Sequence, residues 1–185
     1  MTQVTRRKLY EQLEALPPNK VGEIVDGLLI VSPRPSPPHA IAQTALAGLL
    51  APPFMFGRGG PGGWWILAEP ELHLGDDVLV PDLAGWRRER LPRMPEGAAF
   101  SVVPDWICEI VSPSSASFDR ETKVTKYARL AIPHAWLIDP IERTLESFAN
   151  DGSAWRAGQT HHGNVTARVA PFEDVPLSLE LLWVS

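Results

Sequence analysis

The chain has 185 residues and a formal net charge of -5, and this length suits one domain, residues 1–185, with a sizeable core. Its 44% hydrophobic and 21% charged residues are typical of a soluble globular protein, and no apolar run approaches the roughly 20 residues that span a bilayer. Mild acidity argues against a protein coated in nucleic acid, because non-specific affinity comes from Lys and Arg, but it leaves room for a local basic groove.

The cytoplasm is the expected compartment, with no membrane partner. The basic stretch 6–8 is followed by polar residues where a signal peptide needs an apolar core. Cys108 is the only cysteine, so no intramolecular disulfide can form. Its apolar neighbours predict a small buried side chain rather than a reactive thiol.

The first part of the chain predicts a helix, a hairpin and a second helix. Leucine spacing and proline breaks indicate helices over residues 4–16 and 39–50, the second ending before Pro52-Pro53. Between them, strands over 21–25 and 28–31 flank Asp26-Gly27, a strong two-residue turn signal because Asp and Gly tolerate positive φ.

The rest of the chain is strand-rich. A meander of antiparallel strands is expected, followed by a helix over about 118–130 that Pro133 ends. The expected strands cover residues 64–74, 78–86, 105–111, 134–139, 144–148, 154–157 and 165–169. The pattern indicates an α+β (mixed α/β) fold with an N-terminal helix and hairpin and extra C-terminal strands.

An acid inside an apolar stretch is the most informative feature of the sequence. Glu109 lies within the run from Trp106 to Val111. A carboxylate in a buried strand loses its hydration, so it needs a cation, a proton or a strong donor. This need points to a metal ion or a catalytic lysine.

Two further residues complete a candidate active site. Asp82 stands late in an apolar strand that could pair beside the strand of Glu109, and Lys123 lies on the next helix. Two such carboxylates can share one Mg²⁺, and an ammonium could orient or deprotonate a water or neutralise charge on a phosphate. Taken singly, the same residues could be a turn acid, a salt-bridged acid and a solvated lysine.

Four arginines fall within seven positions directly after the strand of Asp82. The segment includes Arg87 and Arg88 beside Trp86. Such a loop could hold a phosphate backbone over the site, but taken alone it is better explained as a solvated connector.

Several short motifs that follow one another along the chain resemble the Uma-two family of restriction endonucleases within the PD-(D/E)XK nuclease superfamily. The resemblance runs from about Glu23 to Phe148. It is carried by Val80-Pro81-Asp82-Leu83, Glu109-Ile110-Val111-Ser112-Pro113-Ser114, Asp119 with Lys123 and Tyr127-Ala128, and Ile132-Pro133-His134-Ala135-Trp136-Leu137-Ile138-Asp139-Pro140.

This resemblance implies a restriction-endonuclease-like core, a mixed β-sheet flanked by helices, and Mg²⁺-dependent cleavage of nucleic acid. It implies metal binding by Asp82 and Glu109, with Ile110 in the same set. The simplest form of the motif has a lysine two positions after the second acid, where this chain has Val111. In similar families the lysine moves to the following helix, so Lys123 matches it, with Lys126 as the nearby competitor.

Two residues have open roles. Glu23 resembles the glutamate of the family's Glu-x-x-Asp-Gly turn and could join the site, or it could be an exposed hairpin residue. Tyr127 lies four residues from Lys123, hence on the same helical face, and could position it, line a substrate groove or simply pack. No histidine is assigned to catalysis, because His39 and the others show no metal-ligand spacing with cysteine.

The leading hypothesis is a Mg²⁺-dependent endonuclease that hydrolyses DNA, with Mn²⁺ as a possible substitute and a homodimer as a possible assembly. The alternative is a non-catalytic nucleic-acid-binding or protein-interaction module that retains the acids for structure. DNA and RNA cannot be separated from the sequence, and neither can base specificity.

Overall fold

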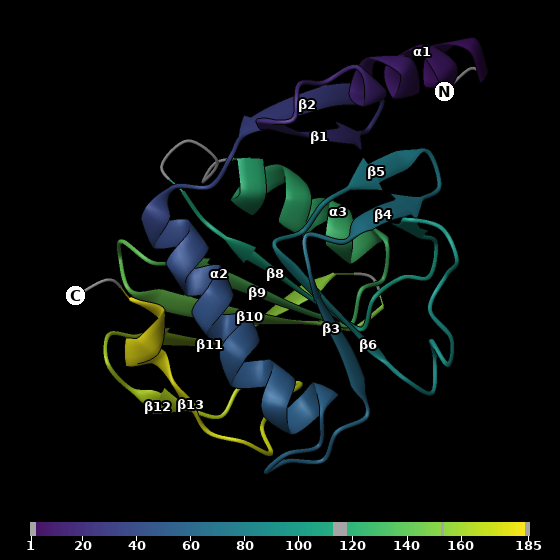
Figure 1. The fold of residues 1–185 in the computed structure, drawn as a ribbon. Coiled ribbons are helices and arrows are strands. Elements are labelled where there is room, and N and C mark those ends of the chain that lie inside the picture. The colour runs from purple at the N-terminus through teal and green to yellow at the C-terminus, as the bar shows by residue number, and fades with distance from the viewer. Residues whose placement is uncertain (1–2, 113–117, 153, 184–185) are drawn as a thin grey trace.

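The computed structural model describes residues 3–112, 118–152 and 154–183, and its chain forms α-helices around two larger sheets (Figure 1). The helices are α1 (Gln3–Glu14), α2 (Pro37–Leu50) and α3 (Val124–Arg129), with shorter helical turns η1 (Ala51–Met55), η2 (Phe118–Lys123) and η3 (Leu179–Leu182). The strands are β1 (Lys20–Val25), β2 (Leu28–Pro33), β3 (Trp64–Ala68), β4 (Glu71–Leu74), β5 (Asp77–Leu79), β6 (Leu83–Arg87), β7 (Ala99–Phe100), β8 (Trp106–Ile110), β9 (His134–Asp139), β10 (Thr144–Asn150), β11 (Trp155–His162), β12 (Thr166–Ala167) and β13 (Leu177–Ser178).

The larger sheet is mixed, as the sequence predicts. Its six strands follow the order β11-β10-β9-β8-β6-β3. The β8–β9 pair is parallel, whereas the other neighbours in this sheet are antiparallel. The second sheet has the order β2-β1-β5-β4-β7 and carries the N-terminal hairpin. The predicted α+β class, with an added N-terminal helix and hairpin and C-terminal strands, is confirmed.

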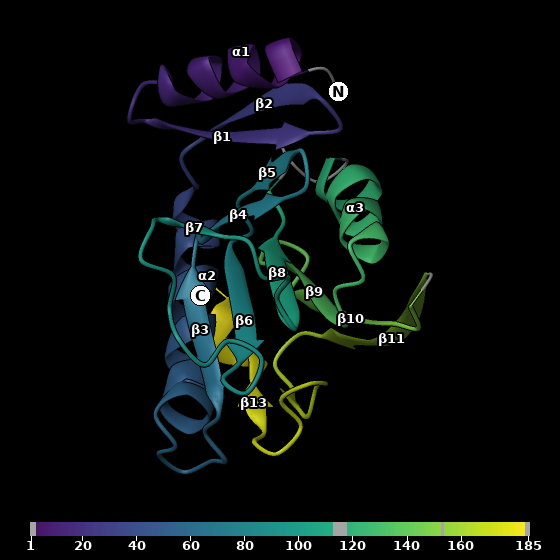
Figure 2. The ribbon, with the colours of Figure 1, turned by 90° about the vertical axis from the view of Figure 1, so that its right-hand side faces the viewer.

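Helices α2 and α3 cover opposite faces of the six-stranded sheet (Figure 2). Alternate side chains of β8 divide between these faces: Cys108 packs in the cluster that includes Leu46 of α2, and Ile107 packs in the cluster that includes Tyr127 of α3. This alternation is the period-2 pattern of a strand buried on both faces. Cys108 is fully buried, as predicted.

Two predicted long strands are each divided between the sheets. The predicted strand 64–74 becomes β3 and β4, and the predicted strand 78–86 becomes β5 and β6. The breaks fall at Pro70 and Pro81, which have no N–H to donate to a strand ladder. The chain therefore crosses between sheets there, and Asp82 stands directly after one crossing.

Another difference is local. Helix α2 ends at Leu50, as predicted, but the π-helical turn η1 follows it directly and includes Pro52-Pro53, and the Phe56 N–H donates to the Ala51 carbonyl there. The motif residues Pro113 and Ser114 lie outside the described residues. Across the described part of the chain, no helix has both the length and the apolar character to cross a membrane.

Candidate active site

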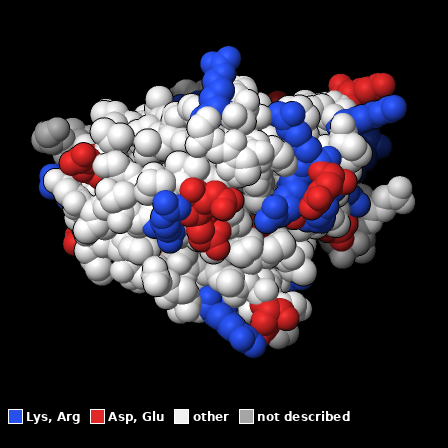
Figure 3. All heavy atoms as spheres, turned by 90° about the horizontal axis from the view of Figure 1, so that it is seen from below, with Lys and Arg blue, Asp and Glu red and all other residues white. Residues whose placement is uncertain are grey.

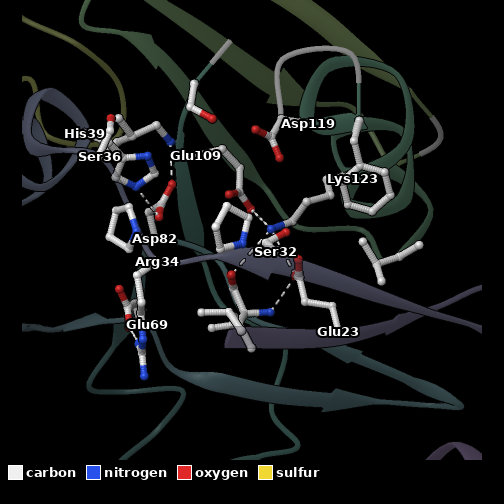
Figure 4. Close-up of a pocket in the computed structure, with 18 of the residues that line it drawn as sticks. Glu23, Ser32, Arg34, Ser36, His39, Glu69, Asp82, Glu109, Asp119 and Lys123 are labelled. Carbon is white, nitrogen blue, oxygen red and sulfur yellow. Dashed lines mark hydrogen bonds and ion pairs between the residues drawn. The ribbon is translucent and has the colours of Figure 1, made fainter. Parts of the chain in front are cut away.

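A cavity of about 560 Å³ lies between the β1–β2 hairpin and the ends of β6 and β8. The hairpin side contributes Val31 and the linker residue Arg34, and the opposite side contributes Ile110 and the start of η2. Figure 4 shows the polar side chains that meet there. They include Glu23, His39, Asp82, Glu109, Asp119 and Lys123.

The pairing of β6 with β8 brings the two predicted metal-binding acids together. Leu83 lies opposite Cys108 in antiparallel register, so Asp82 and Glu109 adjoin this pair at the same end of the two strands. The Ile110 N–H donates to Asp82 Oδ2 at 2.6 Å, which ties this carboxylate to the end of β8. Both side chains line the same cavity, and the charge of Asp82 acts on Glu109.

Glu109 is buried and held by two donors. Its Oε1 accepts hydrogen bonds from the Lys123 ammonium at 2.8 Å and from the Tyr127 hydroxyl at 2.5 Å. Burial raises the pKa of Glu109 well above its usual range, and the charge of Asp82 adds to this, although Lys123 opposes it. Burial therefore favours a proton or a nearby cation at Glu109, and Lys123 supplies one such cation.

Lys123 reaches the cavity from the last position of η2. Its ammonium lies 3.0 Å from Glu23 Oε1 and 3.4 Å from the Val80 carbonyl oxygen, in addition to its contact with Glu109. Burial alone would lower the pKa of Lys123, but Glu109 and the other nearby acids outweigh burial and raise this pKa well above its usual range. The side chain is therefore a fixed positive charge.

Glu23 points into the site rather than to solvent. It is buried on β1, and its Oε1 accepts a hydrogen bond from the Val80 N–H at 2.8 Å as well as the ion pair with Lys123. Glu23 could have joined the site or been an exposed hairpin residue, and the structure places it in the cavity beside the other acids. The hairpin thereby supplies one wall of the cavity and one of its charges.

The donor set suits a hard divalent cation. The charged neighbours that act on Glu109 are one ammonium, Lys123, and the carboxylates of Asp82, Asp119 and Glu23, so negative charge is in excess. Within the described ranges, no group of three or more His, Cys, Asp or Glu forms a ready metal cage. Mg²⁺ typically takes one or two protein carboxylates and completes its shell with water and phosphate oxygens, so the residues present fit it.

Tyr127 and Lys126 lie outside the cavity lining. Tyr127 is fully buried beneath Glu109, so the structure gives it a supporting contact and no place in a substrate groove. Lys126 pairs with Asp77 at 2.6 Å and with Asp26, away from the cavity. Of the two candidate lysines, Lys123 is the one that the structure brings to the acids.

The arginine segment is not brought to the cavity. Arg87 is the last residue of β6 and Arg88 follows it, so both lie at the far end of the strand from Asp82. Arg88 donates to the main-chain carbonyls of Trp64 at 3.2 Å and Met55 at 2.7 Å, and the Arg87 guanidinium lies 4.6 Å from the centre of the Trp64 ring. Their placement gives no support to the predicted role in substrate binding.

His39 is a site residue that the sequence analysis missed. Its Nε2–H donates to Asp82 Oδ1 at 2.7 Å, and the ring lines the cavity. The search for histidines relied on spacing to cysteine, whereas the contact of His39 with Asp82 spans 43 positions and has no local signal in the sequence. Asp119 also lines the cavity, although the sequence analysis named it only as part of a family motif.

A mixed sheet between helices, with acids at the ends of paired strands and a lysine on the next helix, is the architecture of a restriction-endonuclease-like nuclease core. The chain belongs to the Uma2 family, described as "Putative restriction endonuclease", whose model matches residues 8–180. A solved structure described as a "putative nuclease belonging to DUF820" from Anabaena variabilis has a TM-score of 0.70 and 23% identity, over 95% of this chain and 96% of that one. At that identity the likeness shows the shared fold. No curated protein is similar enough to match.

Proposed function

We propose that this protein is a divalent-metal-dependent endonuclease that hydrolyses phosphodiester bonds in DNA, with Mg²⁺ as cofactor and Mn²⁺ as a substitute. The observation that carries this proposal is the meeting of Asp82, Glu109 and Lys123, from two paired strands and the next helix, in one cavity. Membership of a restriction endonuclease family supports the nuclease class.

Asp82 and Glu109 would hold the cation, with Ile110 adjoining it. Bound there, the cation would polarise the phosphate and lower the pKa of a water. The main-chain N–H of Ile110 and the Tyr127 hydroxyl fix the two carboxylates in place. Preorganised charges of this kind need not reorganise during the reaction, which is how such sites lower a barrier.

Lys123 would act as a permanent cation rather than as a base. An ammonium among buried acids keeps its proton, as its raised pKa indicates. It would therefore stabilise the negative charge that develops on the phosphate, while Glu23 and Glu109 hold it in position. Lys123 would therefore contribute electrostatic stabilisation, and the metal site would activate the water.

The test is cleavage of supercoiled plasmid, single-stranded DNA and RNA with Mg²⁺, with Mn²⁺ and with chelator. Asp82→Asn and Glu109→Gln should each slow cleavage by about 100-fold or more, the scale typical of losing one preorganised charge contact. Asp105→Asn is a matched control, because Asp105 is also a buried acid next to β8 but pairs with Arg90 at the other end of that strand.

The outcomes separate the two classes of function. Cleavage that needs metal and Asp82 supports the nuclease. Metal-independent binding of nucleic acid without cleavage would favour a non-catalytic module, and cleavage by Asp82→Asn at the wild-type rate would refute the assigned site. Thermal melting of each variant checks that the fold is retained.

A further inference from the structure

Two side chains of one helix contact the same residue of the site. His39 and Gln43 stand four residues apart on α2, hence on one face of the helix. His39 Nε2–H donates to Asp82 Oδ1 at 2.7 Å, and Gln43 Nε2–H donates to the Asp82 main-chain oxygen at 2.9 Å. The helix therefore fixes both the backbone and the carboxylate of Asp82.

The hydrogen bonds to Asp82 leave room for a cation. An ionised carboxylate only accepts hydrogen bonds, and each of its oxygens has two lone pairs. Oδ1 accepts a hydrogen bond from His39 Nε2–H, and Oδ2 accepts one from the Ile110 N–H at 2.6 Å. Among the described residues each oxygen accepts from one donor, which leaves a second lone pair on each for a cation, and the carboxylate is held from both sides (Figure 4).

The helix that carries His39 is itself firmly placed. Ala42, Leu46 and Leu50 of α2 are completely buried in the core cluster beneath the sheet. The side chains of His39 and Asp82 are only 11% and 16% exposed. A hydrogen bond to a charged group in such surroundings is stronger than one in water, so it can set the orientation of the carboxylate.

We propose that His39 is a positioning residue of the metal site, which orients the Asp82 carboxylate toward a bound divalent cation. This inference rests on the proposed function, because it assumes that Asp82 is a metal ligand. Partners that hydrogen-bond to metal ligands typically contribute about 10–100-fold to metal affinity. His39 acts through Asp82 and need not touch the substrate.

The experiment measures Mn²⁺ binding to the full chain without substrate, from the signal of free Mn²⁺ in electron paramagnetic resonance, with Mg²⁺ as competitor. His39→Ala should weaken Mn²⁺ binding by about 10-fold or more. His39→Gln, which retains an N–H donor, should recover part of the loss. In cleavage assays, His39→Ala should need more metal for half-maximal rate but approach the wild-type rate at saturating Mn²⁺.

His73→Ala provides a matched control. His73 also pairs with a carboxylate, Glu71 at 2.6 Å, but it does not line the cavity. Its replacement should leave Mn²⁺ affinity unchanged. If His39→Ala fails to fold, His39→Gln carries the comparison, and a wild-type affinity in a variant without any donor, such as His39→Leu, would overturn the inference.

The inference and the proposed function fail in different ways. Wild-type Mn²⁺ affinity in His39→Ala, together with its loss in Asp82→Asn, would refute the role of His39 and keep the metal site. Absence of Mn²⁺ binding in the wild-type protein would refute both.

Discussion

Lys123 is the residue whose surroundings decide most about the chemistry. Its side chain is almost completely buried, and its ammonium lies within 3.0 Å of carboxylate oxygens of Glu23 and Glu109. Removing the ammonium would leave these two acids buried without their shared partner. Loss of one member of a buried ion pair typically costs about 3–5 kcal/mol.

Replacement of Lys123 should therefore reduce both stability and activity. In metal-free buffer, Lys123→Met is expected to lower the free energy of unfolding by about 3 kcal/mol. Urea unfolding measures this change, and the plasmid assay measures the loss of cleavage.

Lys126→Met is the paired comparison. Lys126 also contacts two acids, and its pair with Asp77 is buried, with side chains 11% and 10% exposed. Its loss should therefore also cost about 3 kcal/mol, but it should leave cleavage near the wild-type rate because Lys126 does not line the cavity. A larger loss of cleavage in Lys126→Met than in Lys123→Met would reverse the assignment of the two lysines.

At the scale of elements, the β1–β2 hairpin is fixed against the rest of the molecule. β1 pairs with β5, and the turn residue Asp26 is joined to Lys126 of α3 and, through its N–H, to Asp77 at 2.9 Å. Because β1 also carries Glu23, these contacts hold one wall of the cavity in place. The hairpin is thus part of the site and not only an addition to the core.

The turn contact predicts a pH-dependent stability difference. The hydrogen bond from Lys126 lowers the pKa of Asp26 below its usual range. A lowered pKa in the folded state adds stability above the unfolded pKa of about 3.9, and this stability is lost as the pH falls through the folded value. Asp26→Asn should therefore cost about 0.5 kcal/mol at neutral pH and almost nothing near pH 2.

Urea unfolding of both proteins at the two pH values checks this prediction. Asn suits the site because it tolerates the positive φ of 50° that Asp26 adopts. A stability difference that stays constant or grows in acid would show that the Asp26 charge does not stabilise the hairpin.

Local sequence patterns predicted most of the helices and strands. Contacts between residues far apart in the chain could not be predicted from these patterns. The hairpin depends on the turn at Asp26 and Gly27, both with positive φ, and such a turn can be recognised from two residues. Pro70 and Pro81 mark where the long strands break, but the sheet that each half joins could not be predicted, because it depends on contacts across the chain.

The same distinction applies to the site. Asp82 and Glu109 could be paired in advance, since adjacent strands in a predicted meander place their ends together. The contact between His39 and Asp82 spans 43 positions and depends on how α2 packs on the sheet, which no local pattern encodes. Arg87 and Arg88 were expected near the site because they are close to Asp82 in the sequence. The extended strand β6 lies between them and Asp82, so they lie at its opposite end.

At the scale of the whole molecule, neither the net charge nor the face opposite the hairpin indicates a basic surface for a nucleic acid backbone. The net charge is -5, and on the face opposite the hairpin Lys and Arg are intermixed with Asp and Glu (Figure 3). The basic residues of the described cavity lining are Arg34 and Lys123, and both are paired with acids. Binding of substrate should therefore depend mainly on the metal.

This charge distribution predicts a weak salt dependence of DNA binding. A protein that neutralises about two phosphates of a single strand loses only about sevenfold in affinity between about 50 and 200 mM salt, whereas six or more contacts would cost about a thousandfold on a duplex. Fluorescence anisotropy of a labelled oligonucleotide, with Ca²⁺ to support binding without cleavage, measures this slope. Chelation of Ca²⁺ should abolish binding. A steep salt dependence that persists in chelator would instead reveal a basic surface that binds DNA independently of the acids in the cavity.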